Sequence, residues 1–342
     1  MSPRSGPPLD GAIDVHAHYV TPRLRAAMVD AGHAEPDGMP AIPDWSPESA
    51  LADMDSLGVA TALLSVSSPG VHFGSDADAR RLARDVNTEG AEIAAARPDR
   101  FGLLASLPLP DVTGALAEVE HAFDALGADG ITLHTHYDGK HLGHPEHEPL
   151  LSALDERAAV VVLHPTSPPC WEAVSAGLPR PLLEFPFETT RAVASLVLSG
   201  ALERHPRIRF VVPHAGAALP VLADRIAAFS LISGGPPIDV AGALRGLHYD
   251  LAGFALPRQL PALLALADPD RLLYGSDLPF TPAPVARGLA EALAADATLT
   301  AEQQRSMRRG AAEALFPRFA RPGPPGAAEP RPDDRSLRGD QR

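Results

Sequence analysis

Eight short apolar or β-branched runs alternate along this chain with segments of helical periodicity. The run 159–163, Ala-Val-Val-Val-Leu, is apolar throughout, as is typical of a strand buried on both faces of a parallel sheet. The pattern predicts strands near 12–16, 60–67, 101–107, 130–136, 159–165, 208–214, 247–252 and 271–277. Apolar residues three or four positions apart predict helices near 47–57, 76–96, 112–126, 147–158, 188–203, 217–231, 256–267 and 283–295.

Alternation of strands and helices indicates a parallel sheet with right-handed crossovers. Eight strands are the number that closes a (β/α)8 TIM-type barrel, and a length of 342 residues fits that fold. An open doubly wound sheet is the alternative, but it would place a glycine-rich turn after the first strand, where this chain has His-Ala-His. We therefore expect a single α/β barrel over residues 10–318, between a flexible segment 1–9 and a disordered tail 319–342 rich in Pro, Gly and Arg.

The composition excludes several classes of partner and chemistry. A formal net charge of −14 argues against nucleic acid or an anionic membrane as a partner. No segment approaches the ~20 unbroken apolar residues of a membrane span, and the N-terminus lacks the apolar core of a signal peptide. The single cysteine, Cys170, excludes an internal disulfide and fits a cytoplasmic location. Because Lys140 is the only lysine, any chemistry that needs a lysine would have to use it.

His16 and His18 stand one residue apart at the end of the first expected strand. Residues i and i+2 of a strand point the same way, so the two imidazoles should lie side by side where an apolar run meets a loop. Neutral imidazole is a favoured ligand of divalent metals. In a chain with 14 histidines such a pair is a weak signal by itself, and it gains weight only if other ligands follow other strands.

Three further strand ends carry side chains of the same kind. The fifth, sixth and eighth expected strands end in His164, His214 and Asp277. A lone histidine at a strand end is more often a hydrogen-bonding residue, and a lone Asp before Leu-Pro more often forms a turn. The carboxyl ends of barrel strands, however, share the rim at which active sites lie. Four such ends on one rim therefore favour a metal centre there.

Together these motifs resemble the amidohydrolase superfamily. The resemblance covers about residues 10–318 and rests on His-Ala-His, on Leu-His-Pro at 163–165, on His-Ala-Gly at 214–216 and on Tyr-Gly-Ser-Asp-Leu-Pro-Phe at 274–280. Within it, the chain is most similar to amidohydrolase family 2, the amino-carboxymuconate-semialdehyde decarboxylase type. The segment 184–190, Glu-Phe-Pro-Phe-Glu-Thr-Thr, is similar to decarboxylases of the 6-methylsalicylate type.

The resemblance implies a set of roles at the rim. The implied metal ligands are His16, His18, His164 and Asp277. His214 is the implied acid/base residue, and either His214 or Asp277 would be the proton donor. Binuclear branches of the superfamily add a carboxylated lysine at the end of strand four, but Lys140 falls beyond that strand. One divalent ion is therefore expected, with zinc the first choice and manganese the next, and no organic cofactor.

Other residues are candidates for contact with the substrate: Arg225, His134, His136 and Phe280. In the family, an arginine at the position of Arg225 can reach the neighbouring site of a homodimer and bind a carboxylate. The alternative is an ordinary arginine on a helix surface. His134 and His136 repeat the His-x-His spacing, so they are either rim residues that hydrogen-bond substrate or loop, or a second metal site. The nearby His141, His144 and His147 are expected to face solvent.

The function expected from these residues is metal-dependent, non-oxidative decarboxylation of a hydroxylated aromatic acid of the salicylate type, or of a related unsaturated carboxylic acid. The alternative is a metal-dependent hydrolase that opens a lactone or cleaves an ester or amide, because metal-bound water with a pKa near ~7 could use the same residues. A third hypothesis, a purely structural metal, fits poorly because structural zinc sites are usually closed and rich in cysteine.

Overall fold

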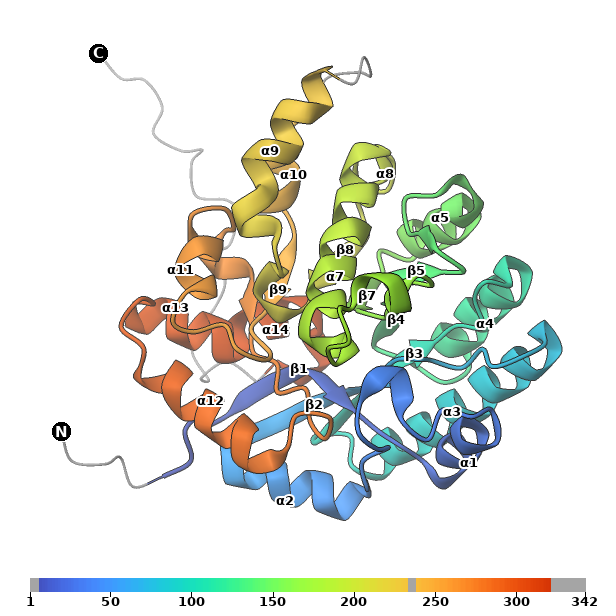
Figure 1. Ribbon diagram of the computed structural model, residues 1–342. Helices are drawn as coiled ribbons and strands as arrows, with labels where there is room; N and C mark the ends of the chain where they lie inside the picture. Colours follow the sequence, from blue (N-terminus) through green and yellow to red (C-terminus); the bar gives the residue numbers. More distant parts are fainter. Residues whose placement is uncertain (1–5, 233–237, 321–342) are drawn as a thin grey trace, which may run out of the picture.

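The computed structural model describes residues 6–232 and 238–320, and much of the expected flexible N-terminus and C-terminal tail lies outside them. Its main sheet has eight strands in the order β1-β2-β3-β4-β7-β8-β9-β10, all paired in parallel (Figure 1). The strands are β1 Ala12–His18, β2 Val59–Ser65, β3 Phe101–Ser106, β4 Gly130–His134, β7 Val160–His164, β8 Arg209–Val212, β9 His248–Asp250 and β10 Leu272–Leu273. A hairpin of β5 His136–Tyr137 and β6 Lys140–His141 follows β4.

The two edges of this sheet meet and close it into a barrel. Tyr274, just after β10, accepts a hydrogen bond from the backbone N–H of Val15 at 3.0 Å. Beyond it, Leu278 accepts one from the N–H of His18 at 2.7 Å, and the N–H of Asp277 donates to the carbonyl of His16 at 2.8 Å. The predicted (β/α)8 TIM-type barrel is therefore confirmed.

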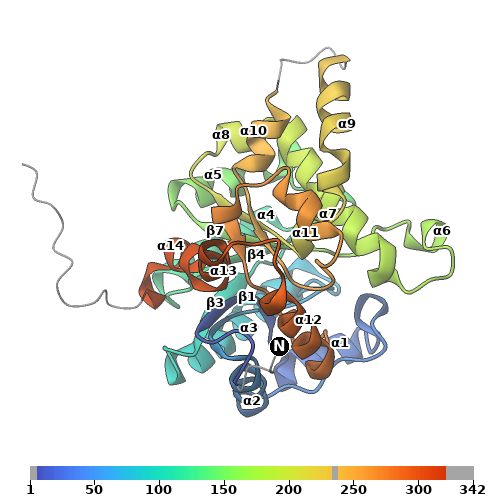
Figure 2. The ribbon, with the colours of Figure 1, turned by 90° about the vertical axis from the view of Figure 1, so that its left-hand side faces the viewer.

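Helices surround the sheet, as Figures 1 and 2 show from two sides. They are α1 Pro22–Asp30, α2 Pro47–Leu57, α3 Asp76–Ala96, α4 Val112–Asp124, α5 Glu148–Glu156, α6 Trp171–Val174, α7 Arg180–Leu198, α8 Ala201–Arg204, α9 Leu219–Ile232, α10 Val240–Arg245, α11 Gln259–Leu264, α12 Ala283–Ala295, α13 Ala301–Arg305 and α14 Ala311–Leu315. Within the described ranges, no helix combines the length and apolar character needed to cross a membrane.

Local sequence explains where the helices begin and end. Helix α2 begins after Ser46, whose hydroxyl accepts the N–H of Ser49 at 3.1 Å, and ends at Gly58, whose φ of 83° favours glycine. The helix expected over 188–203 differs from the observed one. Helix α7 begins at Arg180, with a proline in its first turn, tolerates Pro186, and stops before Gly200, whose φ is 72°.

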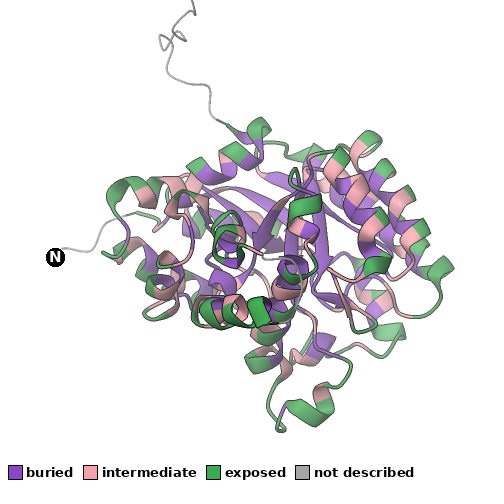
Figure 3. Ribbon diagram, turned by 90° about the horizontal axis from the view of Figure 1, so that it is seen from above, coloured by how far each residue is buried: buried purple, intermediate pink, exposed green. Residues whose placement is uncertain are grey.

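Two apolar layers hold the barrel together. One lies between the sheet and the helices, and the other fills the barrel, so that the strands are buried on both faces (Figure 3). The inner cluster contains Ile13, Val15 and Leu104 and also α14 with Phe316 and Phe319. Since Arg209, the first residue of β8, donates to the carbonyl of Leu315, α14 lies across the amino ends of the strands and seals that end. The opposite end is left for the functional site.

Candidate active site

A shift in strand register directs the paired histidines of β1 inward. Ile13 and Val15 pack inside the barrel, and strict alternation from them would turn His16 and His18 outward. The pairing of β1 with β2 changes register between Asp14 and Ala17, as at a β-bulge. Both rings then lie on the inner side with centroids 5.1 Å apart, so the predicted side-by-side arrangement is present.

Four of the predicted residues converge at the carboxyl ends of the strands. His16, His18, His164 and Asp277 each offer one ligand atom, and these atoms all lie within 4.8 Å of one another. The three histidines are buried, and the Asp277 side chain is 20% exposed toward the cavity above. Four donors of this spacing from β1, β7 and the segment after β10 could hold one metal ion.

Hydrogen bonds on the far side of the rings fix which nitrogen faces the centre. The Nδ1 of His16 lies 2.9 Å from Asp250 Oδ2, and the Nδ1 of His164 lies 2.8 Å from the carbonyl of Pro165. Carbonyl and carboxylate oxygens only accept, so both Nδ1 atoms carry hydrogen, and in the neutral form of each ring the lone pair is on Nε2. The Nε2 of His16 is buried and has no hydrogen-bond partner among the residues that the structure describes. In the neutral ring this buried nitrogen is an acceptor without a partner. It faces the possible ligand atoms of His18, His164 and Asp277, and this position fits a metal ligand.

The electrostatics of the centre favour an anionic Asp277, a neutral His164 and a positive charge at the position of His16. Burial and the neighbouring imidazoles lower the pKa of His164 well below its ordinary value. Burial would raise the pKa of Asp277, but its hydrogen bond with His18 and the charge of His16 outweigh that effect and lower it. At His16, burial is outweighed by the carboxylates of Asp250 and Asp277, which raise its pKa to about 9. A cation at this position is thus strongly stabilised.

His214 lies beside this centre rather than within it. Its ring centroid is 5.1 Å from that of His16, and its φ of 54° is in the left-handed region. The backbone on either side is held in place: the N–H of His214 donates to Asp250 Oδ1 at 3.0 Å, and the amide of Gln259 donates to the His214 carbonyl at 2.6 Å. Burial lowers the pKa of His214, as does the charge of His16. A neutral imidazole is therefore positioned next to the four ligands.

Asp250 holds His16 and His214 in place, although no sequence motif pointed to it. One carboxylate oxygen accepts from His16 and the other from the backbone of His214 and of Ala252. The side chain is fully buried at the end of β9. Its position near the end of the seventh predicted strand, on the same rim as the other site residues, could have identified it from the sequence.

A large, mostly apolar cavity of about 670 Å³ opens above the centre. His164, His214 and Asp277 lie in its wall, together with the predicted Phe280, whose ring is 5.5 Å from that of His18. The loop around Asp37, between α1 and α2, forms part of the roof.

Asp37 anchors that roof. It is buried, and its carboxylate accepts hydrogen bonds from Ser68 at 2.6 Å, from the N–H of Ser167 at 2.8 Å and from Arg180 at 3.2 Å. The guanidinium of Arg180 in turn lies 4.3 Å from the centre of the Trp171 ring. Asp37 thus joins its own loop to the loops that contain Ser68 and Ser167, across the mouth of the barrel. No sequence motif predicted this network.

His134 and His136 do not form a second pair like His16 and His18. Strand β4 ends at His134, earlier than expected, and His136 begins the hairpin that follows. The Nε2 of His136 lies 3.0 Å from the Ser167 carbonyl, and its Nδ1 accepts the N–H of Gly139 at 3.3 Å. Because both nitrogens are engaged, His136 is a poor metal ligand. His134 lines a second, smaller cavity.

The expectation that the loop histidines face solvent is wrong for His147 and His141. His147 is buried, and its Nδ1 lies 3.2 Å from the carbonyl of His141. His141 is half-buried, with its Nε2 2.9 Å from the buried carboxylate of Glu188 on α7. Packing of the β5–β6 hairpin against α7 brings these residues inward, a tertiary contact that local sequence does not reveal.

Arg225 lies apart from the centre of its own chain. It is exposed on α9, and its guanidinium stacks 4.7 Å from the Phe229 ring centre. With Leu222 and Ile226 it lines a surface hollow that shares no residue with the cavity above the metal centre. The structure therefore does not bring Arg225 together with the other predicted site residues.

Comparison with known proteins shows the family to which the chain belongs. The family model described as amidohydrolase matches residues 13–318. The chain belongs to the amidohydrolase family. An amidohydrolase II of known structure, 38% identical, superposes with a TM-score of 0.85 over 90% of this chain and 100% of its own.

Two relatives of this amidohydrolase have names that state an activity. The 6-methylsalicylic acid decarboxylase of Penicillium expansum is 36% identical over 315 residues, which cover 90% of this chain and 96% of the relative. The decarboxylase yanB of Aspergillus niger is 34% identical over 327 residues, which cover 91% and 88%. The resemblance to the decarboxylase branch of the family is confirmed.

Proposed function

We propose that this amidohydrolase is a metal-dependent, non-oxidative decarboxylase of a hydroxylated aromatic acid of the salicylate type. The observation that carries the proposal is the convergence of His16, His18, His164 and Asp277 beneath an apolar cavity with His214 beside them. The decarboxylase names of relatives that match nine-tenths of the chain support the carboxy-lyase reaction.

One divalent ion, zinc or alternatively manganese, is the proposed cofactor. The unpaired Nε2 of His16 and the lone pair on the Nε2 of His164 fit a cation bound at their centre. A second metal would require Lys140 as a bridge. Lys140 lies in β6 of the hairpin, and its Nζ donates to Glu146 Oε2 at 2.6 Å. When bound, such an ion supplies Lewis-acid stabilisation to the carboxylate of the substrate.

The remaining steps are assigned to the side chains of the chain itself. Decarboxylation requires a proton on the ring carbon that carries the carboxylate, followed by cleavage of the bond to that carboxylate as CO2 leaves. His214 and Asp277 both border the cavity, and either could hold that proton. Asp277 is kept oriented by Thr281, whose hydroxyl donates to Oδ2 at 3.0 Å. The apolar wall with Phe185 and Phe280 excludes water from the ring.

A homodimer is the proposed assembly, with Arg225 reaching the partner's site. Helix α9 projects from the barrel (Figure 2) and exposes apolar side chains, with Val221 75% and Ile232 74% accessible to solvent. Large exposed apolar surfaces mark interaction sites. A guanidinium beside such a surface could bind a substrate carboxylate of the neighbouring subunit.

A cytoplasmic location is also proposed. Cys170 is exposed and is the only cysteine of the chain, so it has no partner for a disulfide within the chain. A free, exposed thiol fits a reducing compartment. Fractionation of cells that express the protein tests the location.

The reaction itself separates this proposal from a hydrolase. The protein loaded with zinc or manganese is incubated with 6-methylsalicylate and other salicylates in deuterated water without organic cofactors. Decarboxylation gives CO2 and a product with one deuterium at the carbon that lost the carboxylate. A panel of lactones and esters provides the comparison, and a product that gains water and keeps all its carbon would select the hydrolase.

A further inference from the structure

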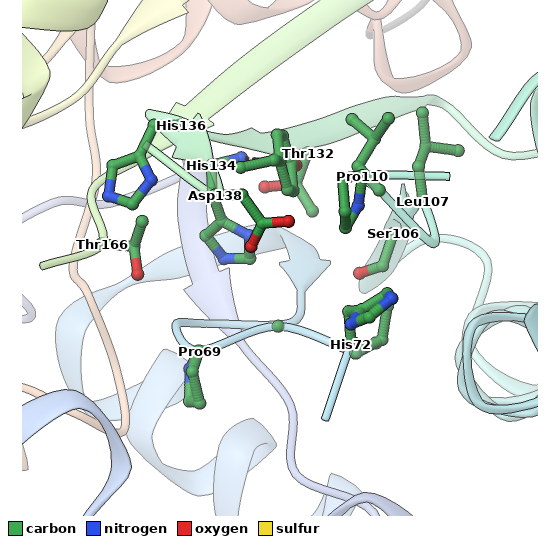
Figure 4. A pocket seen from close by; sticks show the side chains of 14 residues that line it. Pro69, His72, Ser106, Leu107, Pro110, Thr132, His134, His136, Asp138 and Thr166 are labelled. Atoms are coloured by element: carbon green, nitrogen blue, oxygen red, sulfur yellow. Dashed lines mark hydrogen bonds between the residues drawn. The ribbon is translucent and has the colours of Figure 1, made fainter. Parts of the chain in front are cut away.

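A second cavity, of about 150 Å³, lies beside the metal centre and shares no lining residue with the large apolar cavity. Figure 4 shows it from close by. Pro69 and His72 line it from the loop after β2, Ser106 from the end of β3, and Thr132 and His134 from β4. Its rim includes the exposed Asp138 of the hairpin turn, so the cavity runs from the surface toward the barrel interior.

Three of the side chains that line this cavity each have a buried polar atom without a partner in the described parts of the chain. Ser106, Thr132 and His134 are only 4%, 3% and 8% exposed. The two hydroxyl oxygens and the Nε2 of His134 have no hydrogen-bond partner anywhere in the described parts of the chain. The His134 ring does bond to the Ser67 backbone, and because Nε2 is unpartnered the nitrogen involved is Nδ1. Nε2 is then an acceptor, and leaving such groups unpaired costs about 1–3 kcal/mol each.

The chemistry of the lining indicates a neutral ligand. Two hydroxyls can both donate and accept, and the imidazole nitrogen accepts. Neither Arg nor Lys occurs among the described residues that line the cavity, so there is no fixed cation for a carboxylate or bicarbonate. Water satisfies such a set of groups, and the volume holds several molecules, since each needs roughly 10–15 Å³ of this kind of space.

The cavity adjoins the metal centre through His134, which lines it. The His134 ring lies 5.8 Å from the ring of the ligand His164. The loop after β2 separates the two cavities, with Ser67 and Ser68 lining the large one and Pro69 and Gly70 the small one. An added Cβ at Gly70 would lie 2.7 Å from His134 Cε1, so glycine lets this loop pack against the imidazole. Asp37 anchors the loop through Ser68.

We propose that the second cavity is a solvent chamber for the metal centre. Ordered water hydrogen-bonded to Ser106, Thr132 and His134 keeps the wall of the centre in exchange with bulk solvent while an aromatic acid fills the large cavity. Each turnover of the proposed reaction breaks one carbon–carbon bond, releases CO2 and forms one carbon–hydrogen bond, so one proton from solvent must be replaced. This role rests on the proposed decarboxylation, whereas the binding of water does not.

A crystal structure of the zinc-loaded protein, alone and with salicylate, tests the binding of water directly. We expect ordered water within hydrogen-bond distance of Ser106 Oγ, Thr132 Oγ1 and His134 Nε2 in both crystals, with the aromatic ring in the large cavity. A dry chamber would overturn the proposal, as would salicylate bound inside it. This result does not depend on whether the protein decarboxylates anything.

The substitution Thr132→Val then tests the role of the water, because it removes one hydroxyl and keeps the shape. Thr189→Val is the matched control: Thr189 is fully buried on α7, its hydroxyl has no partner within the described chain, and it lines neither cavity. We expect Thr132→Val to lose ordered water and to lower kcat about 2- to 10-fold, the size of one net hydrogen bond, with KM and metal content unchanged. An unchanged kcat despite lost water, or loss of metal, would overturn the proposed role.

Discussion

Asp250 joins His16, a proposed metal ligand, to His214, the proposed acid/base residue, through the two oxygens of one carboxylate. Its Oδ2 lies 2.9 Å from His16 Nδ1, and its Oδ1 lies 3.0 Å from the backbone nitrogen of His214. Burial would raise the pKa of Asp250, but the charge of His16 and the hydrogen bond with it lower that pKa, so the group is a carboxylate in the folded protein. A single side chain therefore orients the ring of His16 and holds the backbone of His214 in position.

Replacement of Asp250 by Asn should weaken metal binding. The amide lacks the charge that orients His16, and its NH2 group would face either the His16 or the His214 N–H. Loss of such an outer carboxylate typically lowers metal affinity about 10- to 100-fold. Competition with a zinc chelator measures the affinity. Asp239→Asn is the control, because Asp239 caps α10 and Asn caps a helix equally well. Equal affinities in the two variants would contradict this role.

Purified protein should hold about one tightly bound divalent ion per chain, because four ligands form one centre. Elemental analysis measures this stoichiometry. Alanine at His16, His18, His164 or Asp277 should lower the occupancy. His33→Ala serves as a control, since His33 contacts Phe73 away from the centre. Two ions per chain, or full occupancy in His164→Ala, would refute the ligand assignment.

His214→Asn should retain metal and lose activity. The side chain stands beside the ligands and borders the cavity, so its loss removes a proton-transfer group, an effect of about 10²- to 10⁴-fold on kcat. Metal content and kcat are measured on the same preparation. If metal is lost together with the imidazole, His214 is a ligand and the division of roles is wrong.

Arg225→Ala should fold normally and bind substrate poorly if α9 lends this residue to a partner. Substitutions of exposed residues usually change stability by only ~0.5 kcal/mol. Mixing this variant with His214→Asn tests the exchange: a mixed dimer has one site with both an intact His214 and a borrowed Arg225, so part of the activity should return. Full activity in a monomer, or no recovery after demonstrated subunit exchange, would leave Arg225 as a surface residue.

His248 should make the protein less stable as the pH falls from about 6.5 to about 4. Burial and the nearby charges of Arg271 and Arg209 lower its pKa to about 4 in the folded state. The unfolded chain then binds more protons in this range, so the free energy of unfolding rises with pH, by on the order of 3 kcal/mol in total. Urea unfolding from pH 5 to pH 8 at fixed zinc should show a flatter profile for His248→Gln. Parallel profiles would exclude this contribution.

Much of the site followed from one rule, that side chains at the carboxyl ends of barrel strands share a rim. His16, His164 and Asp277 each lie at the end of a predicted strand, and that placement put them on one rim. The role of Asp250 was not predicted, because Tyr-Asp at the end of a strand matches no motif. The burial of His147 could not be predicted either, because it depends on the packing of a hairpin against a helix.

The fold was also predictable from regular patterns in the sequence. The prediction differed from the structure where contacts between distant segments decide the conformation. The spacing of apolar residues predicted the bounds of α2, α3 and α12, whereas the segment around Pro186, which forms the first half of α7, was not predicted to be helical. The register shift in β1 is set by pairing with β2 and leaves no local signal. Tertiary contacts decide such details, and a single sequence does not encode them in a local pattern.

Closure of the barrel also has a consequence for the chain as it is being synthesised. His18 and Asp277 are 259 residues apart, and the seal formed by α14 and Phe319 comes later still. A nascent chain that stops short of residue 277 has three imidazoles and no carboxylate, one unpaired edge of β1, and an open end to the barrel. We therefore expect the proposed metal centre to form only in chains that extend past Asp277 and through α14.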